Sequence, residues 1–100
     1  MTDSIKTRLE KEWDLDEGFL GRLRMRVFDQ EAHRRLLEIL SQIPASPTLD
    51  RDLVRLIWYI PVFLEWNKEQ VVSISNVDET TYERAGNALL GEIERILGLP

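Results

Sequence analysis

The sequence predicts a single all-α domain over residues 1–100, a compact bundle of four to five short helices around a central helix. Apolar residues recur every three or four positions over most of the chain, which is the period of an amphipathic helix. Short stretches rich in Pro, Gly and Asp separate these segments, as expected for turns. The 100 residues suffice for one hydrophobic core and are too few for two.

The composition excludes several classes of protein. With 43% hydrophobic and 31% charged residues, the chain is typical of a globular protein rather than a disordered one. The lack of cysteine excludes disulfides, thiol nucleophiles and thiolate metal sites. The net charge of −5 disfavours non-specific binding to nucleic acid or anionic membranes and would attract a basic partner.

The chain shows no targeting or membrane signal. Its first residues, MTDSIKTRLEKEW, are charged throughout and lack the apolar core of a signal peptide. No segment has the roughly 20 consecutive apolar residues that a membrane span requires. We therefore expect a cytoplasmic protein.

The first helix is expected from Ser4 to Trp13, with Asp3 or Ser4 as its N-cap. Its apolar stripe is narrow, so this helix should lie on the outside of the domain. The stripe consists of Ile5, Leu9 and Trp13, while Lys6, Arg8, Glu10, Lys11 and Glu12 are expected to face solvent.

The second helix follows a break in the pattern, and Asp14 or Asp16 is its expected N-cap. Gly18 and Gly21 weaken its first turn. They indicate either close approach of another backbone or a helix that begins after Gly21. Its apolar face consists of Phe19, Leu20, Leu23 and Val27, with Phe28 at the edge.

The third helix should begin after an Asp29 N-cap and run to about Ile43. A loop containing Pro44 and Pro47 ends it. The apolar side of this helix consists of Ala32, Leu36, Leu37, Ile39, Leu40 and Ile43.

The central helix is expected at about 48–68, capped by Thr48 or Asp50 and kinked at Pro61, which has no amide hydrogen for the Ile57 carbonyl. In the alternative, an α+β fold, the helix ends near Tyr59 and a small hairpin occupies about 62–75. In both cases residues 71–76 are expected to form a loop or an extended piece. The core face of the central helix consists of Leu53, Leu56, Ile57, Ile60, Phe63 and Leu64.

The last helix begins after an Asp78 N-cap and ends at Gly98, a natural residue for the C-terminus of a helix. Its apolar face is broad. It consists of Tyr82, Ala85, Gly86, Leu89, Leu90, Ile93, Ile96 and Leu97.

The opposite face of the central helix is the candidate binding site. It places two tryptophans and a valine, spaced four residues apart, among charged residues. The site comprises Arg55, Trp58, Val62, Glu65, Trp66 and Glu69. Alternatively, the terminal helices bury the tryptophans as a second side of the core. The pattern favours burial for Trp58 and does not decide for Trp66.

The residue pattern contains no catalytic motif. His33 is the only histidine, so the chain lacks the His and Cys ligands of a usual zinc site. In a Ser–His pair, His33 would have to be the base, and no serine stands in the usual nucleophile motif. No glycine-rich phosphate loop is present. The nearest approach to a paired acid site is Glu65 with Glu69, which makes a small carboxylate enzyme the least favoured hypothesis. We expect no catalysis, cofactor or metal.

The function predicted from these features is that of a small acidic protein–protein interaction domain, such as an inhibitor, an immunity-like protein or an adaptor. The comparison with immunity proteins concerns size and charge only. The expected partner is another protein, with a basic protein or a second copy of the chain as candidates. The alternative is a helical nucleic-acid-binding regulator that uses Arg22, Arg26, Arg34 and Arg35 of the second and third helices.

Overall fold

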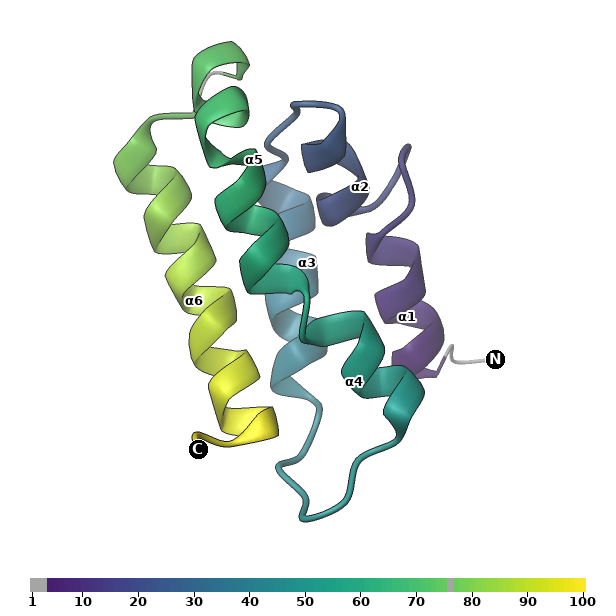
Figure 1. Cartoon of the computed structure of the whole chain (residues 1–100). Coiled ribbons are helices and arrows are strands. Elements are labelled where there is room, and N and C mark those ends of the chain that lie inside the picture. Colours follow the sequence, from purple (N-terminus) through teal and green to yellow (C-terminus); the bar gives the residue numbers. More distant parts are fainter. Residues whose placement is uncertain (1–3, 76) are drawn as a thin grey trace.

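The computed structural model describes residues 4–75 and 77–100, which form six α-helices and no strand (Figure 1). The predicted all-α bundle is therefore confirmed. The hairpin alternative at 62–75 is wrong, because a helix covers that segment. The helices are α1 (Ile5–Glu12), α2 (Phe19–Arg24), α3 (Gln30–Ser41), α4 (Arg51–Ile57), α5 (Ile60–Ile74) and α6 (Glu79–Leu97).

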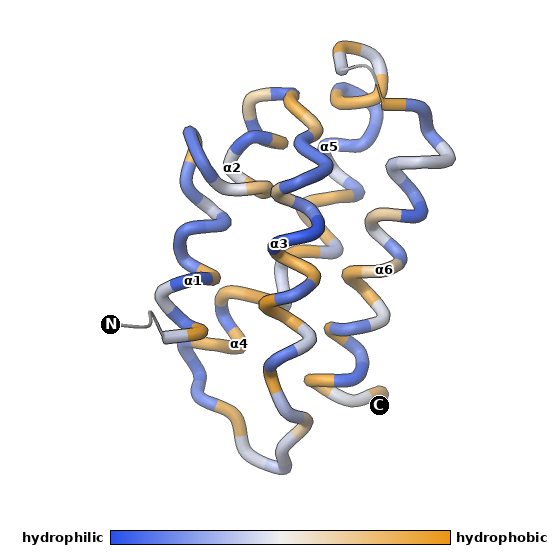
Figure 2. The backbone as a smooth tube through the Cα atoms, turned by 180° about the vertical axis from the view of Figure 1, so that it is seen from behind, coloured by the Kyte–Doolittle hydropathy of each residue, from blue (hydrophilic) through white to orange (hydrophobic). Residues whose placement is uncertain are grey.

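The helices lie in two layers. Figure 1 shows α4 and α5 in front, and Figure 2, seen from behind, shows α3 between α1 and α6. The front helix α5 packs against α6 and α2, while α4 packs against α1. The molecule measures 39 × 35 × 18 Å, so it is flat, and its core lies between the two layers. None of the other described helices lies in front of the outer face of α5 (Figure 1).

The core is built from the predicted apolar faces. In the central segment Leu56, Ile57, Ile60, Phe63 and Leu64 are buried, whereas Leu53 is partly buried. Of the faces predicted for the other helices, Val27, Leu90 and Leu97 are exposed. The remaining buried apolar residues are Leu9, Phe19, Leu20, Leu23, Ala32, Leu36, Ile39, Leu40, Ile43, Val71, Val77, Tyr82, Ala85, Leu89, Ile93 and Ile96.

The central segment is broken before Pro61 rather than kinked at it. The helix α4 ends at Ile57 and α5 begins at Ile60, so Pro61 stands in the first turn of α5. There its missing N–H costs nothing, because the first amides of a helix have no intrahelical acceptor. The indole N–H of Trp13 donates to the Leu56 carbonyl (3.1 Å), which gives a partner to a backbone oxygen near the break.

Helix α5 runs to Ile74, beyond the predicted end of the central helix. The loop or extended piece expected at 71–76 is therefore wrong through Ile74, while Asn76 lies outside the described residues. Helical propensity is weak in this stretch, and burial explains the difference. Val71 is fully buried in the core, and packing of this kind commonly overrides propensity.

Four helices begin at predicted N-caps, and the side chain of each cap residue accepts a hydrogen bond from a backbone N–H of its helix. Asp78 accepts from Thr81 at 2.6 Å, and this hydrogen bond lowers the pKa of Asp78. Asp3, the other candidate cap of α1, lies outside the described residues. The remaining pairs are Ser4 with Thr7 (3.2 Å), Asp29 with Ala32 (3.1 Å) and Asp50 with Asp52 (2.8 Å).

The predicted cap of α2 is wrong, because its N-cap is Gly18. The Asp14 carboxylate instead accepts the amides of Asp16 (3.0 Å) and Glu17 (2.9 Å) in the preceding turn. The first amide of α2, that of Phe19, donates to the Glu12 carboxylate (3.0 Å). Glu12 was expected to face solvent and is buried, because it serves this amide and the guanidinium of Arg35 (2.6 Å).

Gly18, the N-cap of α2, and Gly21 within the helix allow the backbone before the helix to come close, as the first of the two interpretations predicted. A Cβ atom at Gly18 would lie 2.3 Å from the Glu12 carbonyl, and one at Gly21 would lie 1.8 Å from the Asp14 oxygen. The helix includes Gly21, so the interpretation in which it begins later is wrong.

Candidate protein-interaction surface

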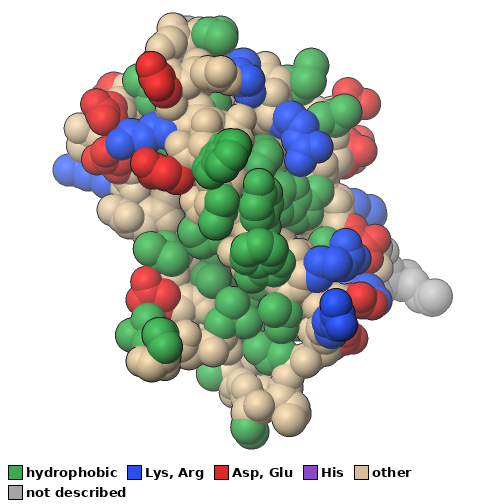
Figure 3. Space-filling view, viewed as in Figure 1, with side chains coloured by type: hydrophobic (Ala, Val, Ile, Leu, Met, Phe, Trp, Pro, Cys, Tyr) green, Lys and Arg blue, Asp and Glu red, His purple; other side chains and the backbone are tan. Residues whose placement is uncertain are grey.

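The largest aromatic side chains left in solvent form one strip on the front face. We call Trp58, Tyr59, Val62 and Trp66 the apolar strip; their exposed fractions are 51%, 37%, 37% and 79%. Trp58 and Tyr59 pack edge to face with ring centroids 5.3 Å apart. Figure 3 shows hydrophobic side chains gathered in the middle of this face, over α5 and the end of α4.

The strip is exposed because the neighbouring helices cover the flanks of α5 and not its outer face. The helix α6 packs along one side and α2 against the other (Figure 1). The expectation that Trp58 is buried is therefore wrong. The question left open for Trp66 is answered by its exposure, because no terminal helix lies over it.

The edge of the strip facing α6 is acidic. Glu65 and Glu69 of α5 are exposed and form no ion pair with other described residues. On the same side Lys68 contacts Glu83 at 2.5 Å and Glu79 at 3.2 Å. These two carboxylates raise the pKa of Lys68 to about 12, so the lysine stays charged and is already paired. This side thus carries four carboxylates and one ammonium group, which is paired with two of them, and we call it the acidic edge.

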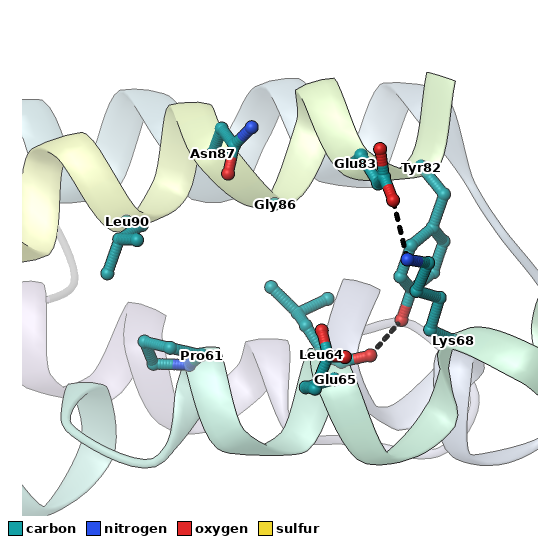
Figure 4. Close-up of a pocket in the computed structure, with 9 residues that line it drawn as sticks. All are labelled: Pro61, Leu64, Glu65, Lys68, Tyr82, Glu83, Gly86, Asn87 and Leu90. Carbon is teal, nitrogen blue, oxygen red and sulfur yellow. Dashed lines mark hydrogen bonds and ion pairs between the residues drawn. The ribbon is translucent and has the colours of Figure 1, made fainter. Parts of the chain in front are cut away.

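A groove of about 240 Å³ lies between α5 and α6, and residues of the acidic edge line part of it (Figure 4). At one end of the groove the Tyr82 side chain reaches from α6 toward α5, and its hydroxyl donates to the Leu64 carbonyl at 2.6 Å. Burial, with a smaller effect of the Glu65 charge, raises the pKa of Tyr82 to about 12. The phenol is therefore a fixed hydrogen-bond donor at neutral pH. The groove is lined by Pro61, Leu64, Glu65, Lys68, Tyr82, Glu83, Gly86, Asn87 and Leu90.

The opposite edge, facing α2 and α4, is basic. The guanidinium of Arg24 lies 5.4 Å from the centre of the Phe63 ring and has no carboxylate partner among the described residues. Arg55 borders Trp58 and is 4.0 Å from Asp52, a long contact between exposed groups. One carboxylate, Glu10, lines the same hollow as Arg55. Figure 3 shows Lys and Arg side chains along this side of the strip, which we call the basic edge.

The six predicted site residues all lie on this exposed surface. Arg55 stands on the basic edge, Glu65 and Glu69 on the acidic edge, and the two tryptophans and Val62 in the strip. Sequence reasoning missed Tyr59 and Arg24. Tyr59 lies in the break before α5 and Arg24 lies on another helix, α2. The helical period of the central segment therefore could not predict that either residue belongs to the surface.

The four arginines of the nucleic-acid hypothesis do not form one free patch. Arg35 binds the buried Glu12 carboxylate through two nitrogens, at 2.6 and 2.9 Å. Arg26 follows the end of α2 with a φ of 67°, so it does not share a helix face with Arg22. The other partners are Asp29 for Arg22 (2.6 Å), Glu31 for Arg34 (3.2 Å) and the Asn67 side chain for Arg26 (3.0 Å).

His33 is half-buried and packs against aromatic residues next to the core. Its Nε2–H donates to the Ala85 carbonyl (3.0 Å), and its ring packs on those of Phe19 and Phe28. Within residues 4–75 and 77–100, no group of three His, Cys, Asp or Glu side chains is placed to hold a metal ion. None of the helices in these ranges has the length and apolarity that crossing a bilayer requires.

The candidate surface is thus an apolar strip between one acidic and one basic edge. Its geometry is the only guide to its role, because no protein-family model, curated protein or solved structure matches the chain.

Proposed function

We propose that this protein is a small, non-catalytic cytoplasmic domain that binds another protein through the apolar strip, as an inhibitor, immunity-like protein or adaptor does. The exposure of Trp66 carries the proposal, because 79% of this side chain faces solvent beside a half-exposed Trp58. Tryptophan dominates the energetic centres of protein interfaces. A contiguous exposed apolar patch rimmed by polar residues is typical of a binding surface.

The size of the strip supports the proposal. Given the area of aromatic side chains, the four residues expose on the order of 400 Å². A standard interface covers about 800 Å² on each partner, of which roughly 60% is apolar. The strip therefore supplies most of the apolar area of one standard interface, and its two charged edges supply the polar rim.

The charges favour a partner with basic side chains opposite the acidic edge. Glu65 and Glu69 have no ion pair among the described residues, and the net charge of the chain is −5. Charged groups at a rim steer association and fix orientation more than they add affinity. The predicted partner thus combines an apolar ridge for the strip with Lys or Arg side chains beside it.

The other two hypotheses have weaker support. A nucleic-acid regulator would need arginines free to contact phosphates, and each of its four candidates already bonds a protein group. A carboxylate enzyme would need Glu65 and Glu69 in a sheltered site, and both are exposed.

Two tryptophans provide a matched test of the proposal. Trp66→Ala should weaken partner binding and change the free energy of unfolding by less than about 0.5 kcal/mol, as exposed substitutions usually do. Trp13→Ala should cost roughly 3 to 5 kcal/mol, because Trp13 packs on Phe63 at 5.1 Å and donates to Leu56. Denaturant unfolding measures both values.

Photo-crosslinking in the native cell then identifies what touches the surface. A photoreactive residue at Val62 should capture a protein, and one at the exposed Glu38 of α3 serves as the control on the other layer. Capture at position 38 but not at 62 would contradict the proposed surface. Salt-dependent binding of DNA or RNA that Trp66→Ala leaves intact would favour the nucleic-acid regulator.

A further inference from the structure

We infer that the occupant of the apolar strip is a second copy of this chain, which makes the strip the interface of a two-fold symmetric homodimer. This inference rests on the proposed function and names the partner for the same surface. Its basis is the opposite charge of the two edges. Glu65 and Glu69 on the acidic edge and Arg24 on the basic edge have no ion pair among the described residues, and Arg55 has only its long contact with Asp52.

Symmetry decides which edges meet. In a symmetric contact between two identical faces, the two-fold axis lies in the plane of contact. Residues on the axis meet their own equivalents, whereas off the axis a residue on one side of a face meets a residue from the other side of the partner's face. With the axis along α5, the two strips face each other, and the acidic edge of each protomer meets the basic edge of its partner. With the axis across α5, acidic would meet acidic and basic would meet basic. The charges therefore select the first arrangement, in which the two α5 helices run in the same direction.

The opposite charges of the two edges favour a second copy of the chain over a uniformly basic protein. A uniformly basic partner would pair with Glu65 and Glu69 but would place positive charge against Arg24 and Arg55. A partner that satisfies both edges must carry an apolar strip with a basic edge on one side and an acidic edge on the other. The described surface of this chain has that arrangement.

The area agrees with a standard dimer. Two strips facing each other would bury on the order of 800 Å² of side-chain surface. Homodimer interfaces of standard size bury about 1,600 Å² in total, of which about 65% is apolar. The strips with the stems of the flanking Arg and Glu side chains reach this range, since long charged side chains also bury apolar surface.

Two charge-reversal variants of the full chain test the inference. The first carries Glu65→Arg and Glu69→Arg, which makes both edges basic. The second carries Arg24→Glu and Arg55→Glu, which makes both edges acidic. Each variant alone should dimerise at least tenfold more weakly than the wild type, because like charges then face each other. An equimolar mixture should form a one-to-one heterodimer. Analytical ultracentrifugation measures each state.

Two controls separate this effect from misfolding and from net charge. Glu31→Arg with Glu38→Arg changes the net charge as the first variant does, but on α3, and should leave the dimer intact. Circular dichroism must show native helix content in each variant. If Arg24→Glu disturbs folding by losing its contact with Phe63, Trp66→Ala replaces it and should yield a folded monomer.

Three outcomes would overturn the inference. The first is a wild type that stays monomeric up to about 1 mM, the concentration that corresponds to the weakest affinity worth assigning to an interface. The second is a dimer that survives Trp66→Ala. The third is a pair of charge variants that do not form a heterodimer when mixed. Photo-crosslinking at Val62 distinguishes this failure from failure of the proposed function. Capture of a different protein would reject only the homodimer, whereas capture of no protein would reject both.

Discussion

At the residue scale, a single buried carboxylate joins three helices. Glu12, at the end of α1, is 2% exposed. Its Oε1 accepts the first amide of α2, and its two oxygens bind the guanidinium of Arg35 on α3. Arg35 also donates to the Glu17 carbonyl at 2.7 Å, and its hydrogen bond to Glu12 raises the pKa of Arg35. Every polar atom of the carboxylate thus has a partner, which burial of a charge requires.

We expect Arg35→Met to destabilise the protein far more than Arg34→Met. Removing Arg35 takes away the guanidinium that binds both oxygens of the buried carboxylate, and loss of one member of a buried pair costs about 3 kcal/mol or more. Arg34 pairs with the exposed Glu31, a kind of contact worth at most about 1 kcal/mol. Denaturant unfolding of the two variants measures the difference. Equal losses would show that the pairing of Glu12 does not stabilise the fold.

The role of Glu12 could not be predicted from helical periodicity. It lies in a run of charged residues, and a thin apolar stripe assigns such residues to solvent. Its partner is 23 residues away in the sequence, on a helix whose placement only the whole fold determines. For Trp58 and Trp66, the same periodicity correctly grouped the residues on one face. Their exposure depends on which helices cover that face, and amphipathicity does not contain this information.

At the element scale, the break between α4 and α5 determines the composition of the strip. Pro61 correctly indicated an interruption, but proline tolerates the first turn of a helix, so the interruption falls ahead of it. The turn places Tyr59 against Trp58 and also 6.4 Å from Phe63, ring centre to ring centre. Sequence reasoning therefore found the core face of the central segment and most of its outer face, but not the residue that the turn adds.

Two glycine substitutions test the close approach at α2. Alanine usually stabilises a helix by up to about 1 kcal/mol relative to glycine. Gly91→Ala in α6 should show this gain, because no atom beyond its chain neighbours and the backbone of its own helix lies within 4 Å of the added carbon. Gly21→Ala should instead cost roughly 1 to 3 kcal/mol or more, since its Cβ would lie 1.8 Å from a backbone oxygen. Thermal unfolding compares the two, and a gain at both positions would contradict the observed packing.

At the scale of the whole molecule, the two layers present different outer faces. The molecule is only 18 Å thick in its smallest dimension, so helices of both layers contact solvent. The outer side of α3 carries charged residues such as Glu31, Arg34 and Glu38, whereas that of α5 carries the apolar strip. Both α3 and α5 contribute several residues to the core. The outer face of the front layer is therefore the more apolar of the two, and it is the face on which we propose that a partner binds.

The packing of both layers on one core predicts a single cooperative unfolding transition. The short helices α1 and α4, of 8 and 7 residues, are far below the length at which an isolated helix is stable in water. They depend on the rest of the molecule through Leu9, Leu56 and Ile57, which belong to the same core cluster as the residues of α3, α5 and α6. Unfolding of the larger helices should therefore remove the support of the smaller ones.

Trp13 provides a local probe for this prediction. Of the three tryptophans, Trp58 and Trp66 are exposed, so replacing both by Phe leaves a variant whose indole fluorescence comes from Trp13 alone. Trp13 contacts α4 through Leu56 and α5 through Phe63, so it reports the docking of the short helices. Its denaturant midpoint should coincide with that of far-ultraviolet circular dichroism, as two-state unfolding requires. A lower fluorescence midpoint would mean that α1 and α4 detach while the larger helices remain folded, and the core would then consist of two units that unfold separately.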